Sequence, residues 1–175
     1  MDDARINAIV AEVVKRLRDG SGPVIATPRH ANGRFGMFED IDDAVSAAND
    51  AYKALRDTPV HVRQRAINNM REWTLANLEE MARRAVDETG LGRVGDKINK
   101  NRLVANKTPG MEILRPSAQT GDAGLTLDEY APLGVIGSIT PCTNATETIL
   151  NNGISMIAGG NTVVFNVHPS AKRVL

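Results

Sequence analysis

Two polar stretches near the end of the chain carry the side chains best suited to chemistry. Residues 140–144, Thr-Pro-Cys-Thr-Asn, follow the apolar run 135–139, and residues 166–171 follow the apolar run that begins at Thr162. Both runs have the composition of buried strands, and the residues between them predict a helix that ends at Gly159-Gly160. A strand, a helix and a strand within about 35 residues predict a right-handed parallel crossover. The two polar stretches then meet at the carboxyl edge of the sheet, where ligands bind in α/β folds.

Asn144 has two interpretations. Asn144-Ala145-Thr146-Glu147 has the spacing of a capping box, with Asn in place of Ser or Thr, so Asn144 could be a plain helix cap. Its amide could instead donate a hydrogen bond to a developing oxyanion, beside the positive end of the helix dipole. Spacing alone leaves both interpretations open.

Cys142, the single cysteine, could be a nucleophile, because a helix N-terminus lowers the pKa of a thiol. A nucleophile needs a base, and the only candidate is His168, which could approach from the neighbouring loop or be a polar loop residue. The three histidines show no metal-ligand spacing, so we expect no metal site. One cysteine excludes an internal disulfide and fits a reducing compartment.

Four further segments must position or accompany these loops. Residues 3–18 carry an apolar stripe typical of an amphipathic helix, and 19–36 have loop chemistry; this helix either docks on another molecule or folds back on its own domain. A helix is expected around Ile41–Leu55, with an acidic first turn, and a long helix from Thr58-Pro59 to about Glu88, with a stop at Gly90. The run 90–95 matches GxGxxG but follows a helix instead of a strand, so we interpret it as a helix terminus and loop.

The remaining segments and the composition set limits on function. A loop is expected over 109–124, followed by alternating β-type residues from Leu125 to Glu129. Lys and Arg together number 21, as do Asp and Glu, and this balance argues against a general nucleic-acid binder. No apolar run is long enough to span a bilayer, and the composition favours a soluble, intracellular globular protein. Two parallel strands make a small sheet, so we expect the sequence to be part of a longer protein.

Residues 131–144 and 163–172 together resemble the CoA-acylating branch of the aldehyde dehydrogenase superfamily, and most closely its members packaged in bacterial microcompartments. The resemblance implies an α/β fold with N-terminal helices, part of a Rossmann-like parallel sheet and a β-hairpin of the oligomerisation region. It implies a targeting helix over 1–18, a linker over 19–36 and the N-terminal part of an NAD/CoA-binding domain over 37–175. The oligomerisation strands would lie within 123–133, and the catalytic domain would be absent from this chain.

The family's reaction would be oxidation of a short-chain aldehyde to acyl-CoA with NAD and coenzyme A. It proceeds through a cysteine thiohemiacetal and thioester, and that cysteine would lie outside this segment, which alone we expect to be inactive. The resemblance makes Asn144 the oxyanion donor, with Thr143 as competitor. It places Thr140, Pro141, Cys142 and Thr143 on the nicotinamide side of the cleft, and Asn166, His168, Pro169 and Ser170 near the adenosine part of NAD or CoA.

Two alternatives and three further expectations accompany this interpretation. The protein could be a hydrolytic aldehyde dehydrogenase that releases a free acid, or a non-catalytic, shell-associated fragment. The resemblance implies that residues 3–18 bind a microcompartment shell protein and that the enzyme lies in the cytoplasmic microcompartment lumen. It also implies a homo-oligomer, either a dimer or a tetramer.

Overall fold

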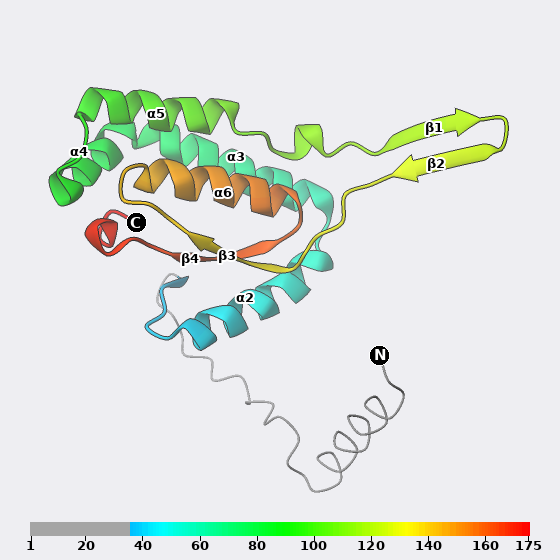
Figure 1. Ribbon diagram of the computed structural model, residues 1–175, viewed down its shortest axis with the longest axis horizontal. Helices are drawn as coiled ribbons and strands as arrows, with labels where there is room; N and C mark the ends of the chain where they lie inside the picture. Colours follow the sequence, from blue (N-terminus) through cyan, green and yellow to red (C-terminus); the bar gives the residue numbers. More distant parts are fainter. Residues whose placement is uncertain (1–35) are drawn as a thin grey trace, which may run out of the picture.

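A computed structural model describes residues 36–175 and shows a bundle of helices beside a small parallel sheet, with a hairpin extending from it (Figure 1). The targeting helix predicted over 1–18 and almost all of the linker predicted over 19–36 lie outside the described residues. In chain order the elements are α2 (Ile41–Arg56), α3 (Val60–Ala76), α4 (Leu78–Thr89), α5 (Val94–Lys107), η2 (Met111–Ile113), β1 (Ser117–Gly121), β2 (Gly124–Asp128), β3 (Val135–Ile139), α6 (Ala145–Ala158), β4 (Thr162–Asn166) and η3 (Pro169–Ala171).

The predicted strand–helix–strand unit is confirmed. Strands β3 and β4 pair in parallel, from Val135 opposite Thr162 to Ile139 opposite Asn166, and α6 connects them. Helix α6 lies on one face of this sheet and α2 on the other (Figure 1). The prediction that both strands are buried is only partly right, because the Ile139 side chain is 84% exposed. In the described residues this parallel sheet has two strands, β3 and β4.

The core lies where α3, α5 and α6 meet. Ile67 and Ile154 are fully enclosed there and are the largest fully buried aliphatic side chains of the described residues. The Met70 side chain of α3 packs over Gly153 of α6: a Cβ at position 153 would lie 2.9 Å from the Met70 Cε atom, so a larger residue would require this flexible side chain to move. The remaining buried members of the cluster are Ala105, Leu150 and Ala158.

The long helix predicted from Thr58-Pro59 to Glu88 is wrong, because the structure has two helices, which meet at Asn77. The Asn77 Nδ2 donates to the Trp73 carbonyl oxygen at 2.7 Å, and such side-chain bonds compete with the regular helical ladder. The predicted cap at Thr58 is also wrong. Its hydroxyl donates to the Ala54 carbonyl at 2.7 Å, and Pro59 is the N-cap residue of α3.

The stop at Gly90 is confirmed, with a left-handed backbone at φ 67°. The GxGxxG run begins at a helix terminus and loop, as predicted, because α4 ends just before it; its last two residues lie in α5. Helix α5 itself was not expected. Its buried residues are Lys97, Asn101 and Ala105, which share one face of a helix without forming an apolar stripe.

The predicted hairpin is present, but its first strand lies outside the expected range. Strand β1 (Ser117–Gly121) falls in the stretch predicted as a loop, and it pairs antiparallel with β2 (Gly124–Asp128). Residues 129–133, included in the predicted oligomerisation strands, are not in a strand. Every residue of the hairpin is exposed, and the hairpin extends away from the helices (Figure 1). The sequence of β1 lacks apolar alternation, so no face is marked for burial.

Candidate functional site

The two polar loops predicted to meet at the carboxyl edge of the sheet do meet there. The Thr140 amide donates to the Asn166 carbonyl oxygen at 3.1 Å and extends the pairing of β3 with β4 by one bond. This bond brings the loop 140–144 beside the loop that begins at Asn166. Of the predicted cofactor residues, Thr140 is buried, Cys142 and His168 are half-buried, and the rest are exposed: Pro141, Thr143, Asn166, Pro169 and Ser170.

Asn144 lies at the N-cap position of α6, but the predicted capping box is wrong. Its side chain makes no cap hydrogen bond. The Asn144 Oδ1 instead accepts a hydrogen bond from the Nζ of Lys100, on α5, at 3.0 Å. Since a lysine ammonium can only donate, this bond turns the amide oxygen toward α5 and leaves Nδ2 as the free donor end of the side chain. The first N–H groups of α6 are left without the cap that a serine or aspartate would supply.

Glu147, the other member of the expected capping box, belongs to a buried cluster. Its Oε2 accepts from the Thr146 hydroxyl at 3.2 Å, and its Oε1 lies 3.8 Å from the Nζ of Lys97, an ion pair without a hydrogen bond. The Lys97 Nζ also donates a short hydrogen bond to the Thr143 carbonyl oxygen. Both charged side chains are nearly enclosed, at 3% and 6% exposed for Lys97 and Glu147. Sequence reasoning missed Lys97 and Lys100 because α5 was not expected.

The hypothesis that His168 activates Cys142 finds no support in the described residues. The His168 Nδ1 accepts a hydrogen bond from the Ser170 amide at 3.1 Å and caps the short helix η3. Within residues 36–175, no hydrogen bond joins the ring of His168 to the free thiol of Cys142. His168 therefore acts as a cap of its own loop.

Buried polar atoms lie behind the loop 140–144. The Ser138 hydroxyl accepts from the Asn152 Nδ2 at 3.0 Å and ties β3 to α6. The Thr140 Oγ1 is enclosed and has no hydrogen-bond partner. An unpaired buried hydroxyl costs free energy, so Thr140 is a position where a further polar group would be favourable.

The end of the second loop is fixed by Glu88, in the last turn of α4. Its carboxylate accepts from the main-chain amides of Arg173 at 2.8 Å and Val174 at 2.6 Å. Partial burial alone would raise the pKa of Glu88, but these two hydrogen bonds and the Arg173 charge outweigh it, so the pKa lies below its ordinary value.

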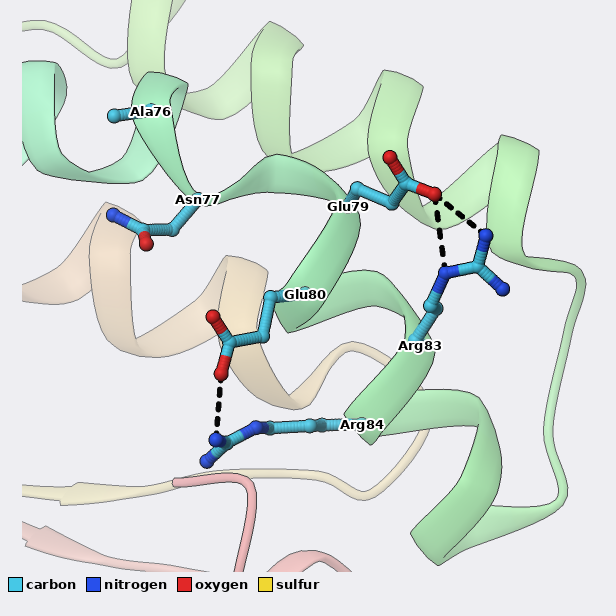
Figure 2. A pocket seen from close by; sticks show the side chains of 6 residues that line it. All are labelled: Ala76, Asn77, Glu79, Glu80, Arg83 and Arg84. Atoms are coloured by element: carbon cyan, nitrogen blue, oxygen red, sulfur yellow. Dashed lines mark hydrogen bonds and ion pairs between the residues drawn. The ribbon is translucent and has the colours of Figure 1, made fainter.

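One hollow of the described surface lies beside the start of α6 and is lined by Asn144, Lys100 and Glu147, among others. Another lies beside the α3–α4 junction, where Glu79 pairs with Arg83 and Glu80 with Arg84 along one helix (Figure 2). These are exposed pairs of the i, i+4 type, which serve the helix itself. In residues 36–175 no three His, Cys, Asp or Glu side chains gather as they would around a metal ion. None of the helices in that range combines the length and apolar character needed to cross a bilayer.

Comparison with known proteins finds relatives whose descriptions agree with one another. The model of the aldehyde dehydrogenase family matches residues 22–175. An acetylating acetaldehyde dehydrogenase of Salmonella typhimurium is 47% identical over 174 residues, which cover 99% of this chain and 36% of the relative. A CoA-propanoylating propanal dehydrogenase of the same species is 43% identical over 148 residues, covering 85% of this chain and 32% of the relative.

Solved structures agree with these sequence matches. A propionaldehyde dehydrogenase from the fucose-utilisation microcompartment of Clostridium phytofermentans has a TM-score of 0.76 at 50% identity, over 79% of this chain and 32% of its own. A propionaldehyde dehydrogenase of Rhodopseudomonas palustris with bound propionyl-CoA has a TM-score of 0.78 at 48% identity, over 82% of this chain and 32% of its own. The chain thus spans about a third of the length of the relatives that it matches.

Proposed function

The chain belongs to the aldehyde dehydrogenase family, and on that basis we propose that the intact protein oxidises a short-chain aldehyde to acyl-CoA with NAD and coenzyme A. The observation that carries the proposal is the arrangement at the start of α6, where Asn144 does not cap its helix and has its amide oxygen held by Lys100. An asparagine kept only as a cap would bond its own first turn. The acylating activity is favoured by relatives named acetylating and CoA-propanoylating dehydrogenases.

In this proposal Asn144 is a catalytic residue that stabilises negative charge. When a cysteine thiolate from outside this segment attacks the aldehyde carbonyl, the carbon–oxygen double bond becomes a single bond and its oxygen carries the charge. The Nδ2 of Asn144 donates to that oxygen, and the positive end of the α6 dipole adds to the stabilisation. Preorganised donors of this kind cost no rearrangement when the charge develops.

Two features of the described residues support a site for a dinucleotide and a thiol cofactor. The buried Thr140 Oγ1 lacks a partner, and the uncapped N–H groups of α6 suit a negatively charged group. We propose that Thr140, Pro141, Cys142 and Thr143 face the nicotinamide side of the cleft. We propose that Asn166, His168, Pro169 and Ser170 lie near the adenosine part of NAD or CoA. When bound, NAD supplies a hydride acceptor and CoA an acyl acceptor.

The test is product analysis with the intact protein. We expect acetaldehyde or propanal, with NAD and CoA, to give NADH and the corresponding acyl-CoA in equal amounts. Omitting CoA should stop turnover after about one equivalent of NADH per active site. Continued NADH formation with release of free acid would instead identify a hydrolytic aldehyde dehydrogenase. Absence of any aldehyde-dependent NADH would favour a non-catalytic, shell-associated protein.

We further propose that residues 3–18 bind a microcompartment shell protein and that the enzyme acts in the lumen as a homo-oligomer. The apolar stripe of this segment supports the idea, because a short amphipathic helix gains stability by docking its apolar face. Replacing Ile9 and Val13 by Glu in a reporter fused to residues 1–36 should abolish its co-sedimentation with shells. Unchanged co-sedimentation would refute the targeting role, and sedimentation velocity of the intact protein would test the oligomer.

A further inference from the structure

Lys97 is a charged residue at a buried position, where an apolar side chain would pack without the cost of removing a charge from water. Its side chain is 3% exposed, and within residues 36–175 its one carboxylate partner is Glu147, at 3.8 Å. Removing such a pair from water costs more than its attraction usually returns. The Lys97 side chain passes close to the α4–α5 connection, since a Cβ placed at Gly92 would be in van der Waals contact with the Lys97 Cε at 3.5 Å. A lysine enclosed in this way has its ammonium held at one point.

The Lys97 ammonium contacts the main chain of the loop 140–144. At the β3 end, the loop is anchored by the Thr140 amide on Asn166. At the α6 end, the Asn144 side chain makes no cap bond. Among the described residues, the Lys97 bond to the Thr143 carbonyl is the one tether that another element gives to the main chain of 141–143. Lys100, one turn further along α5, holds the Asn144 side chain at 3.0 Å.

We propose that Lys97 is a positioning residue that fixes the Thr143 carbonyl and thereby aims the Asn144 amide at the reacting oxygen. This inference rests on the proposed function, because it gives the loop geometry a catalytic purpose. Helix α5 thus positions the oxyanion donor twice, through the main chain by Lys97 and through the side chain by Lys100. Glu147 supplies the counter-charge that lets the lysine be buried.

The first test measures loop mobility and does not depend on activity. Lys97→Met alone would leave Glu147 as an unpaired buried carboxylate, so the principal variant is Lys97→Met with Glu147→Gln. The matched control is Lys53→Met, which removes an exposed lysine that pairs with Asp50 on α2. In hydrogen exchange of the intact protein, we expect the two hydrogen-bonded amides that flank the loop, those of Thr140 and Thr148, to exchange at least about 10-fold faster in the paired variant, with α3 unchanged. Exchange equal to that of the control would overturn the proposal.

The second test asks whether Lys97 acts through Asn144. We expect the paired variant to lower kcat by about 10–100-fold, since a displacement of about 1 Å can cost that much, while the aldehyde KM changes by less than about threefold. The triple variant that also carries Asn144→Ser should turn over about as slowly as Asn144→Ser alone, because both changes disable the same donor. If the fold losses in kcat of the paired variant and of Asn144→Ser multiply in the triple variant, the proposal is overturned. If the wild-type protein forms no acyl-CoA, the proposed function fails, and exchange alone decides whether Lys97 holds the loop.

Discussion

Substituting Asn144 by Ser separates a helix cap from an oxyanion donor. The structure indicates that the folded state should lose little, because the Asn144 side chain makes no cap bond. The substitution removes the 3.0 Å hydrogen bond from Lys100, which is exposed, and exposed charged interactions are worth about 0–1 kcal/mol. A serine at the N-cap position can bond the first turn of α6, which offsets part of this loss.

The kinetic effect of Asn144→Ser should be much larger. A serine hydroxyl is shorter than the amide and cannot place a donor where Nδ2 lies. Loss of one oxyanion donor typically costs about 10²–10³ in turnover, or about 2.7–4 kcal/mol. We therefore expect steady-state acyl-CoA formation to fall at least a hundredfold, with NAD binding and the thermal melt close to wild type.

Thr143→Val is the matched control for this substitution. The Thr143 side chain is exposed, and its hydrogen bond with Lys97 is made by the main-chain carbonyl, which valine retains. We expect turnover of Thr143→Val within about tenfold of wild type, equivalent to about 1.4 kcal/mol. Normal turnover of Asn144→Ser would refute the catalytic role. A large loss in Thr143→Val alone would identify residue 143 as the donor.

Three further changes test other parts of the molecule. Cys142→Ser should keep acyl-CoA formation within about tenfold, because we propose that the nucleophile lies outside this segment; a loss of many thousandfold would show that Cys142 is the nucleophile. Ile67→Ala should lower the free energy of unfolding by about 2–5 kcal/mol in a denaturant titration, since the side chain is fully buried, and a smaller loss would argue against the packed α3–α5–α6 core. The lowered pKa of Glu88 stabilises the native state above the carboxyl's ordinary value of 4.5, and this stabilisation is lost as the pH falls through the lowered folded value. Glu88→Gln should therefore weaken the acid dependence of the denaturation midpoint, and an unchanged pH profile would contradict this.

The strand–helix–strand unit was predictable because its signals are local. Apolar runs mark β3 and β4, and the glycines at 159 and 160 mark the end of α6. Helix α5 was not predictable in this way, because Lys97 and Asn101 occupy its buried face, where a stripe of aliphatic residues is expected. Periodicity of hydrophobic residues cannot detect a helix whose inner face is polar.

The capping box failed for a related reason. The pattern at residues 144–147 describes bonds within four residues, but the partners that the side chains take lie on α5. Asn144 bonds Lys100, 44 positions away in sequence, and Glu147 pairs with Lys97. A short-range motif predicts a cap only when no distant donor competes for the same oxygen. The sequence thus predicted that the two polar loops meet, but it did not reveal Lys97 and Lys100, which contact the first of them.

The pairing of β3 with β4 has a consequence for how the chain behaves while it is being made. In residues 36–175, each of these strands pairs only with the other, so each offers a row of unpaired N–H and C=O groups along its outer side. Ile139 adds an exposed apolar side chain at the end of β3. Such open edges recruit strands from other chains. A nascent chain that has emerged no further than β4 is therefore prone to associate on both sides of its sheet, and a chaperone that shields these edges should raise its soluble yield.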